Sequence, residues 1–217
     1  MLTAILFDLD GTLVNTDPIH YKVWQDILKD YGIEMDETFY KTRISGGLNQ
    51  TIIPNILPQL SVEEVMQLAE DKEARFRELG PELKRLAGLD EVLSWTEKHG
   101  LKRALVTNAP RKNVDFMLST LGLTESFEAV ILAEETTAGK PDPAPYKLAL
   151  SSLNVVAEQA LAFEDSPSGI IAAVGAGIFT VGIASTHEHE DLYKAGAKNV
   201  VADFTDSSLL ELLKKMI

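Results

Sequence analysis

Short apolar runs recur along the chain, and segments long enough to be helices separate them. The predicted strands are residues 2–10, 102–106, 129–132, 160–163 and 179–183, with a last short one at 200–201. Strands that alternate with helices form βαβ units, and successive βαβ units build a parallel sheet. The sequence therefore predicts an α/β fold whose core is a parallel sheet.

Polar residues follow three of the predicted strands. They are Asp8 and Asp10 at the first strand, Thr107 and Asn108 after the second, and Glu164 and Asp165 after the fourth. In open α/β sheets, ligands bind outside the carboxyl ends of the strands. We therefore expect these side chains to gather at one edge of the sheet and to form the functional site.

Two of these carboxylates are separated by a single residue. Because side chains alternate along a strand, Asp8 and Asp10 are expected to leave it on the same side, and Gly11 permits a sharp turn after them. Their mutual repulsion must be offset, most simply by a divalent cation or a shared proton. The alternative is a strand that merely ends in a polar turn.

The long segment between the first two strands has a helical pattern. Thr16 or Asp17 is a fitting N-cap for an amphipathic stretch, and Ser61 with Glu64 forms the capping-box pattern of another helix. The predicted domains are an inserted helical domain at residues 15–80 and a core made of residues 1–14 and 81–217.

Four motifs resemble, in order, those of the haloacid dehalogenase-like phosphatases. They are Asp8-Leu-Asp-Gly-Thr-Leu13, Val106-Thr-Asn108, Gly139-Lys-Pro-Asp-Pro143 and Phe163-Glu-Asp-Ser166. The resemblance covers nearly the whole chain and implies a Rossmann-like parallel-sheet core with helices on both faces. Within that superfamily, the inserted segment is similar to the helical cap domain of the β-phosphoglucomutase-like branch.

The resemblance implies a mechanism with a covalent intermediate. Asp8 is then the nucleophile, since a carboxylate can attack a phosphoryl group and form an aspartyl-phosphate that water hydrolyses. Asp10 is expected to bind the metal through its backbone carbonyl, which leaves its carboxyl to act as general acid and then as general base. The phosphoryl group is expected to contact Thr107, Asn108 and Lys140. The alternatives are a threonine that ends a strand and a lysine in a solvated loop.

The resemblance also implies Mg²⁺ as the cofactor. The expected ligands are Asp8, Asp10, Glu164 and Asp165. Glu164 is expected to act through a water, because Mg²⁺ usually takes only one or two carboxylates directly. The alternative is that one residue of this acidic pair, or Ser166, caps the helix that follows.

Weaker signals lie in the predicted helical domain. Thr16, His20 and Trp24 are spaced by four residues, so they share one helical face, which is expected to contact the substrate. Arg43 and Lys72 are candidates for binding a distal group of the substrate. The alternatives are that the stripe packs inside the helical domain and that both cations are surface residues.

Composition narrows the class of partner. The 217 residues carry a net charge of −13, which disfavours binding to nucleic acid or to an anionic membrane. The chain has no cysteine, which excludes disulfide bonds and thiolate zinc sites. No basic leader precedes the first strand, and glycines interrupt the longest apolar stretch. We therefore expect a cytoplasmic protein, and a monomer.

His187 and His189 are expected in a solvated loop.

The sequence thus predicts a Mg²⁺-dependent phosphatase for a small phosphorylated metabolite, with a sugar phosphate as the expected substrate. A phosphomutase similar to β-phosphoglucomutase is an alternative, in which the phosphoryl group passes to a second sugar hydroxyl. That enzyme needs a cation for the remote phosphate, and the segment after Arg43 has glycine near the expected place of the mutase arginine. Further alternatives are a haloacid dehalogenase, which needs no cation, and a non-catalytic metabolite-binding protein.

Overall fold

The computed structural model describes residues 1–80 and 82–217. The chain forms two compact units, namely a core unit of residues 1–15 and 83–217 and a helical unit of residues 16–82. Pro81, where the second segment of the core was predicted to begin, lies outside the described residues.

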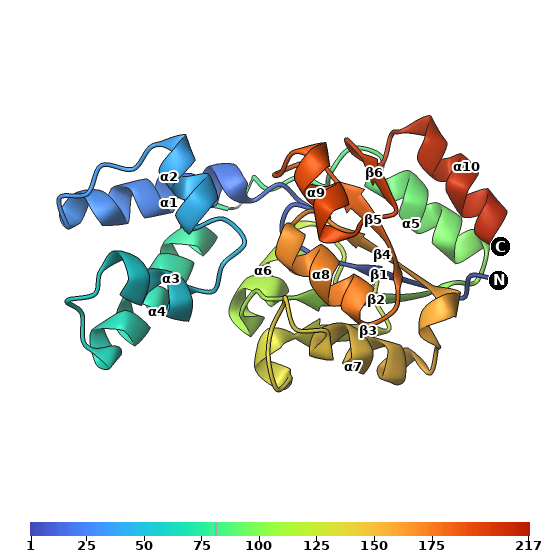
Figure 1. The fold of residues 1–217 in the computed structure, drawn as a ribbon, viewed down its shortest axis with the longest axis horizontal. Coiled ribbons are helices and arrows are strands. Elements are labelled where there is room, and N and C mark those ends of the chain that lie inside the picture. Colours follow the sequence, from blue (N-terminus) through green and yellow to red (C-terminus); the bar gives the residue numbers. More distant parts are fainter. Residues whose placement is uncertain (81) are drawn as a thin grey trace. The chain divides into compact units, whose positions relative to one another are not determined.

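The core unit is built on a parallel sheet with the strand order β3-β2-β1-β4-β5-β6 (Figure 1). The strands are β1 Ala4–Phe7, β2 Lys102–Thr107, β3 Ala129–Leu132, β4 Ala160–Glu164, β5 Phe179–Ile183 and β6 Asn199–Val201. Every pairing between neighbouring strands is parallel. The predicted α/β fold with a parallel sheet is therefore confirmed, and β1 lies in the middle of the sheet.

β1 is shorter than the predicted strand 2–10. The N–H of Asp8 still donates to the carbonyl of Phe163 at 3.0 Å, but the chain then turns, and the N–H of Leu13 donates to the carbonyl of Leu9 at 2.9 Å. Gly11 has φ +83°, a value that L side chains rarely adopt. Local turn bonds thus replace the sheet bonds that a longer strand would need.

Six helices of the core unit connect or follow these strands. They are α5 Leu89–Lys98, α6 Arg111–Thr120, α7 Ala144–Leu153, α8 Pro167–Gly175, α9 His189–Ala195 and α10 Ser207–Met216, with short 3₁₀ helices at Ala133–Glu135 and Ala157–Gln159. The predicted loop at His189 is wrong, because α9 begins there. Leu192 of α9 is buried against Ile170 and Val200, and this packing stabilises a segment whose sequence is mostly charged.

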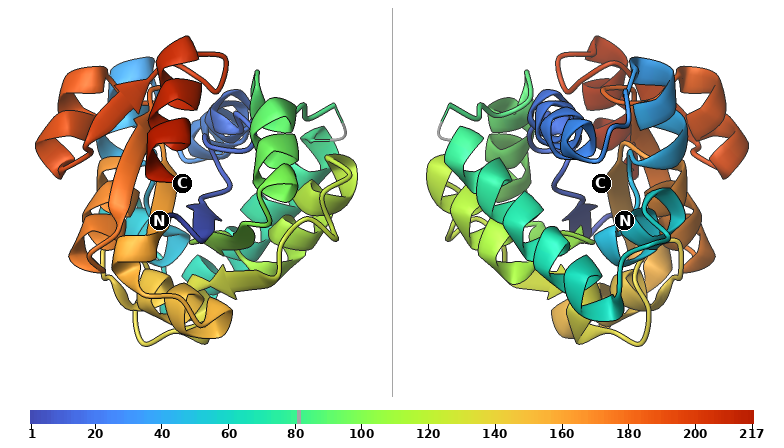
Figure 2. Two further views of the ribbon diagram at one scale, coloured as in Figure 1. Left: turned by 90° about the vertical axis from the view of Figure 1, so that its right-hand side faces the viewer. Right: turned by 90° about the vertical axis from the view of Figure 1, so that its left-hand side faces the viewer.

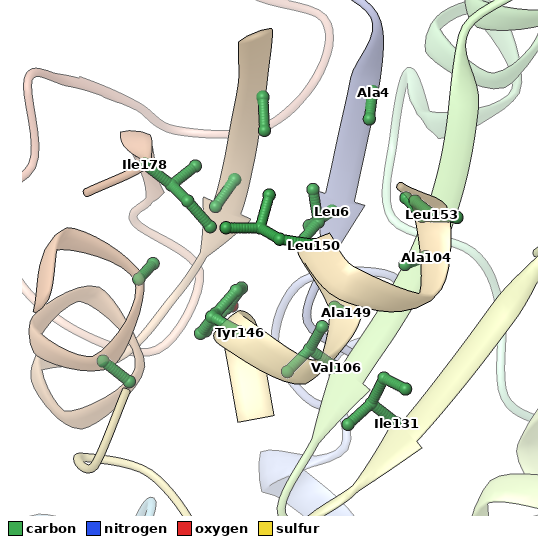
Figure 3. Close-up of a cluster of buried hydrophobic side chains, with 14 residues drawn as sticks. Ala4, Leu6, Ala104, Val106, Ile131, Tyr146, Ala149, Leu150, Leu153 and Ile178 are labelled. Carbon is green, nitrogen blue, oxygen red and sulfur yellow. The ribbon is translucent and has the colours of Figure 1, made fainter. Parts of the chain in front are cut away.

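The sheet is covered by helices on both faces. On one face, α7 and α8 pack on alternate residues of the central strands, among them Ala4 and Leu6 of β1 (Figure 3). The ring of Phe163 contacts those of Phe7 and Phe204. These rings lie on the opposite face, where α5 and α10 lie (Figure 2). Because both faces are buried, the central strand β1 is apolar along its whole length, as parallel strands usually are.

The helical unit has a hydrophobic core of its own. Its helices are α1 Asp17–Asp30, α2 Glu37–Arg43, α3 Asn49–Ile56 and α4 Val62–Leu79. Its core includes Trp24, Leu28, Ile53 and Leu57. α4 begins with the predicted capping box of Ser61. Of the helices that the structure describes, none is both long enough and apolar enough to cross a membrane.

Candidate active site

Three carboxylates meet at the carboxyl edge of the central strands. Asp8 follows β1 directly, and Glu164 ends β4 with Asp165 next to it. Because Phe7 pairs with Phe163 across these neighbouring strands, the acidic residues emerge at the same level of the sheet. One oxygen from each carboxylate lies within 4.8 Å of the others, and all three residues are buried.

Lys140 lies among these carboxylates. Its Nζ donates to Asp8 Oδ1 at 2.6 Å, to Glu164 Oε1 at 2.5 Å and to the carbonyl of Val106 at 2.7 Å. An ammonium has one N–H for each of these acceptors, so its donors are fully used. The backbone of Lys140 is held by the amide of Asn108, which accepts from its N–H at 3.0 Å and donates to its carbonyl at 3.2 Å.

Glu164 is the most enclosed of the three acidic residues. Its Oε1 also accepts from the hydroxyl of Tyr146 at 2.6 Å, and its Oε2 has no hydrogen-bond partner among the described residues. Gly169 of α8 lies directly behind this carboxylate, so that a Cβ at that position would lie 1.9 Å from Oε2. The close approach therefore requires glycine at position 169.

Asp165 is held from the loop after β5. The hydroxyl of Thr186 donates to its Oδ2, and the same hydroxyl lies 2.9 Å from Nδ1 of His187. Ser166 accepts from the N–H of Gly169 at 3.1 Å and is the N-cap of α8. The predicted capping role of Ser166 is therefore confirmed, and Asp165 is left for the site.

The electrostatics of the site favour a bound cation. Burial raises the pKa of Asp8 to about 7, and Glu164 adds to the rise while Lys140 opposes it. Burial also raises the pKa of Asp165 well above its usual range, with further contributions from Asp8 and Glu164. Burial lowers the pKa of Lys140, but the two carboxylates that it contacts more than offset this effect and raise it. One lysine thus does not fully compensate three buried carboxylates.

The donor atoms fit a hard divalent cation. The ligand atoms of the three acidic side chains are all carboxylate oxygens, and Glu164 Oε2 is buried without a donor among the described residues. Oxygen ligands of this kind suit Mg²⁺, Ca²⁺ or Mn²⁺ better than softer metals. A cation here would offset the charge that burial makes unfavourable.

Three other predicted site residues lie after β1 or at the end of β2. Asp10 is half-buried and is not part of the group of three carboxylates. Thr107 is buried at the end of β2, and its Oγ1 accepts from the N–H of Ala109 at 3.0 Å. Asn108 binds the Lys140 backbone through its side chain, an interaction that the sequence analysis did not anticipate. Their roles toward a substrate stay predictions.

The helical unit brings three of its predicted residues together. His20 Nδ1 lies 3.0 Å from Lys72 Nζ, and Lys72 Nζ lies 6.0 Å from the ring centre of Trp24. Lys72 is buried and pairs with Glu73 Oε1 at 2.8 Å, and Asn49 donates to the same oxygen at 2.6 Å. The buried position of Lys72 contradicts the alternative of a surface residue.

The remaining two predicted residues of this unit differ in exposure. Thr16 is buried and is the N-cap of α1, although its side chain makes no capping hydrogen bond. Arg43 is exposed, and its guanidinium lies 5.1 Å from the ring centre of Phe39. A contact between these residues and a substrate stays a prediction.

Sequence reasoning missed four residues that hold the charged groups. They are Tyr146 beside Glu164, Thr186 beside Asp165, and the pair Asn49 and Glu73 beside Lys72. Tyr146 belongs to an apolar helical stripe, where an aromatic residue indicates only packing. The one available signal was Glu73, because a carboxylate next to a lysine offers a local ion pair.

Comparison with known proteins identifies the family. Residues 5–183 match the family described as haloacid dehalogenase-like hydrolase. The chain is 31% identical to Phosphorylated carbohydrates phosphatase of Thermotoga maritima, over 100% of both chains. It is also 31% identical to Fructose-1-phosphate phosphatase of Escherichia coli, over 83% of this chain and 95% of that protein. The structure is similar to the solved structure of β-phosphoglucomutase from Clostridium difficile, with a TM-score of 0.88 and 27% identity. The match covers 100% of this chain and 97% of that protein's chain. The chain therefore belongs to the haloacid dehalogenase-like hydrolases.

Proposed function

We propose that the protein is a Mg²⁺-dependent phosphatase that hydrolyses a small phosphorylated metabolite, a sugar phosphate, through an aspartyl-phosphate on Asp8. The observation that carries this proposal is the group of three buried carboxylates around Lys140. Relatives of similar length that are named as phosphatases of phosphorylated carbohydrates and of fructose 1-phosphate support the choice of substrate class.

The proposed reaction has two steps. In the first, Asp8 attacks the phosphorus atom, the bond to the ester oxygen breaks, and Asp10 donates a proton to the leaving alcohol. In the second, Asp10 takes a proton from a water that attacks the phosphorus, and the bond between Asp8 and phosphorus breaks. Inorganic phosphate leaves, and both carboxyl groups return to their starting states.

In this proposal, Asp8, Asp165 and the backbone carbonyl of Asp10 would hold Mg²⁺, and Glu164 would act through a water. When bound, the cation would supply charge that keeps Asp8 ionised and draws electron density from the phosphoryl oxygens. The ionised form of Asp8 also depends on the ammonium of Lys140, which already donates to it.

The transferring phosphoryl group is assigned three further contacts. The hydroxyl of Thr107 and the backbone N–H of Asn108 each offer a donor, and the ammonium of Lys140 offers a positive charge, to oxygens whose charge redistributes in the transition state. Donors fixed before the reaction need little reorganisation, and both the backbone and the ammonium of Lys140 are held by several hydrogen bonds.

The helical unit is assigned the role of a cap that closes over the substrate and opens to release product. Thr16, His20 and Trp24 are then candidates for contact with the sugar, as are Arg43 and Lys72. The charge of Lys72 is largely balanced, because it is buried beside Glu73 at 2.8 Å. This pairing favours a distal end that carries hydroxyl groups over one that carries a second phosphate.

A panel of phosphorylated metabolites tests the proposed function. We expect sugar monophosphates to release inorganic phosphate in the presence of Mg²⁺, and a chelator to abolish the release. Activity on haloalkanoates that survives complete chelation would favour a dehalogenase instead. Binding of an ester without hydrolysis of any member of the panel would favour a non-catalytic protein.

A phosphomutase is the second candidate. The structural likeness to a β-phosphoglucomutase, with a TM-score of 0.88 at 27% identity, supports it. Such an enzyme passes the phosphoryl group to a second sugar hydroxyl and must hold a bisphosphate, which the balanced charge of Lys72 disfavours. Conversion of glucose 1-phosphate to glucose 6-phosphate in the presence of a bisphosphate activator, faster than release of phosphate, would establish the mutase.

A further inference from the structure

Tyr146 lies where the hydrophobic core meets the acidic group. It is on α7, it is fully buried, and its ring belongs to the apolar cluster that includes Ala149 and Leu150 (Figure 3). Its hydroxyl nevertheless donates to Glu164 Oε1 at 2.6 Å. An otherwise apolar helix face thus directs a single polar atom at the site.

Tyr146 also contacts the cation of the site. Lys140 Nζ lies 5.3 Å from the centre of the Tyr146 ring, within the range of a cation–π contact. The same ammonium pairs with Asp8 at 2.6 Å and with Glu164 at 2.5 Å. One side chain therefore contacts both Lys140 and one of the two carboxylates that share it.

Asp8 and Glu164 compete for the charge of Lys140. Glu164 is fully buried, and its Oε2 has no partner among the described residues. A buried carboxylate with few donors draws strongly on any cation within reach. The hydroxyl of Tyr146 gives Oε1 a second donor, which lessens this pull and fixes the carboxylate in one orientation.

We propose that Tyr146 is a positioning residue of the active site, whose hydroxyl orients Glu164 toward the bound divalent cation and keeps Lys140 shared with Asp8. This inference rests on the proposed function, because it gives Glu164 a role in supporting the cation. Tyr146 acts through Glu164 and does not touch the substrate. Partners that orient metal ligands in this way typically change metal affinity or activity by about 10–100-fold when they are removed.

The test is Tyr146→Phe, which removes the hydroxyl and keeps the ring that packs in the core. Calorimetric titration of Mg²⁺ into the metal-free protein should show affinity lowered by about ten-fold or more. The Mg²⁺ concentration for half-maximal phosphatase activity should rise in parallel, while KM for the substrate at saturating Mg²⁺ stays unchanged. If Tyr146 served packing alone, its loss would not change the Mg²⁺ concentration for half-maximal activity while leaving KM unchanged.

The matched control is Tyr40→Phe. Tyr40 is also buried, and its hydroxyl also donates to a carboxylate, Asp17 Oδ1 at 2.8 Å, but it lies in the helical unit. It loses the same kind of hydrogen bond, so it should leave Mg²⁺ affinity as it is in the wild type. Thermal unfolding of both variants reports whether each one folds.

A double-mutant cycle tests whether Tyr146 acts through Glu164. In a Glu164→Gln background, adding Tyr146→Phe should weaken Mg²⁺ binding little further, because the carboxylate it orients is already gone. The proposal would be overturned if Tyr146→Phe bound Mg²⁺ as tightly as the wild type or could not fold. It would also be overturned if adding Tyr146→Phe to Glu164→Gln weakened Mg²⁺ binding as much as it does in the wild type. A wild type that binds Mg²⁺ but hydrolyses no phosphate ester would refute the proposed function, and the titrations would still decide the role of Tyr146.

Discussion

Asp8 is subject to opposing influences that leave its charge sensitive to its surroundings. Burial and the nearby Glu164 favour its protonated form, while Lys140 favours the carboxylate, and the resulting pKa is about 7. A nucleophile must be ionised to attack, so a cation beside Asp8 would increase the reactive fraction at neutral pH. In the proposed mechanism, the burial of Asp8 therefore makes its ionisation depend on a cation beside it.

Asp8→Asn tests the nucleophile directly. The amide has nearly the same size and can still accept from Lys140, but it cannot form the aspartyl-phosphate. We expect phosphate release to fall by at least about 10³-fold, while circular dichroism and the unfolding midpoint stay close to those of the wild type. Asp115→Asn, at an exposed position of α6, is the control and should retain full activity. Turnover of Asp8→Asn near the wild-type rate would contradict the assignment.

Helix α8 is joined to the site by its first turn. Ser166 caps the helix through the N–H of Gly169, and Gly169 in turn lies against the Glu164 carboxylate. The geometry of the acidic group therefore depends on how this helix begins. A small change in the first turn should affect the site, whereas the same change at the last residue should not.

Gly169→Ala introduces a Cβ that would lie 1.9 Å from Glu164 Oε2. We expect a loss of about 1–3 kcal/mol in the free energy of unfolding, together with weaker Mg²⁺ binding, because the carboxylate must move. The control is Gly175→Ala in the same helix, where the nearest atom is Pro143 Cβ at 3.5 Å, an ordinary contact. Chemical denaturation of both variants measures the difference, and equal effects at the two positions would refute this account.

Helix α4 carries the balanced pair of the helical unit. Burial raises the pKa of Glu73, but Lys72, His20 and the bond from Asn49 more than offset it, so the pKa is lowered and Glu73 is ionised at neutral pH. The pair thus carries little net charge, which supports the proposed contact with a neutral sugar end. Removal of the Glu73 carboxylate should therefore change the selectivity of the enzyme between substrates.

Glu73→Gln leaves Lys72 without its carboxylate partner. If the helical unit contacts the distal end of the substrate, kcat/KM for a sugar bisphosphate relative to the corresponding monophosphate should rise by about ten-fold. Steady-state kinetics with both esters measure the ratio. Glu78→Gln, at an exposed position of the same helix, is the control. An unchanged ratio in Glu73→Gln would show that the pair serves the stability of the helical unit and not its selectivity.

The stability of the protein as a whole should be linked to the cation and to pH. Asp8 has a higher pKa in the folded protein than its ordinary value of 3.8, so folding favours its protonated form. Its contribution to stability is complete below about pH 3.8 and is lost as the pH rises to about 7. A cation that binds the carboxylate form restores stability where the proton no longer does.

Thermal unfolding with and without Mg²⁺ tests this linkage. We expect Mg²⁺ to raise Tm more at about pH 8 than at about pH 5.5, because protons compete with the cation at Asp8 and Asp165 in the more acidic solution. In Asp8→Asn the difference between the two pH values should shrink. An increase in Tm that is the same at both pH values in the wild type would contradict the proposed cation site.

The fold was largely predictable because its signals are local. Buried parallel strands and their connecting helices each have a recognisable length and pattern. Ser61 marks a helix start by its spacing from Glu64, and Ser166 does so by its hydroxyl in front of a helical segment. The end of β1 was missed because turn bonds after Asp8 replace those of the sheet. α9 was missed because its helix depends on the burial of Leu192. A monomeric state and a cytoplasmic location stay predictions.

The order of apolar and polar residues along the chain was enough to place Asp8, Glu164 and Asp165 at one edge of a parallel sheet, because the carboxyl ends of parallel strands always share an edge. The partners that hold these carboxylates come from packing between distant segments. Tyr146 and Thr186 reach the site from α7 and from the loop after β5, and their hydroxyls are indistinguishable in sequence from those of ordinary core or loop residues. A periodic pattern specifies which side of an element is buried, but the atom that each buried side chain meets is set by how the elements pack.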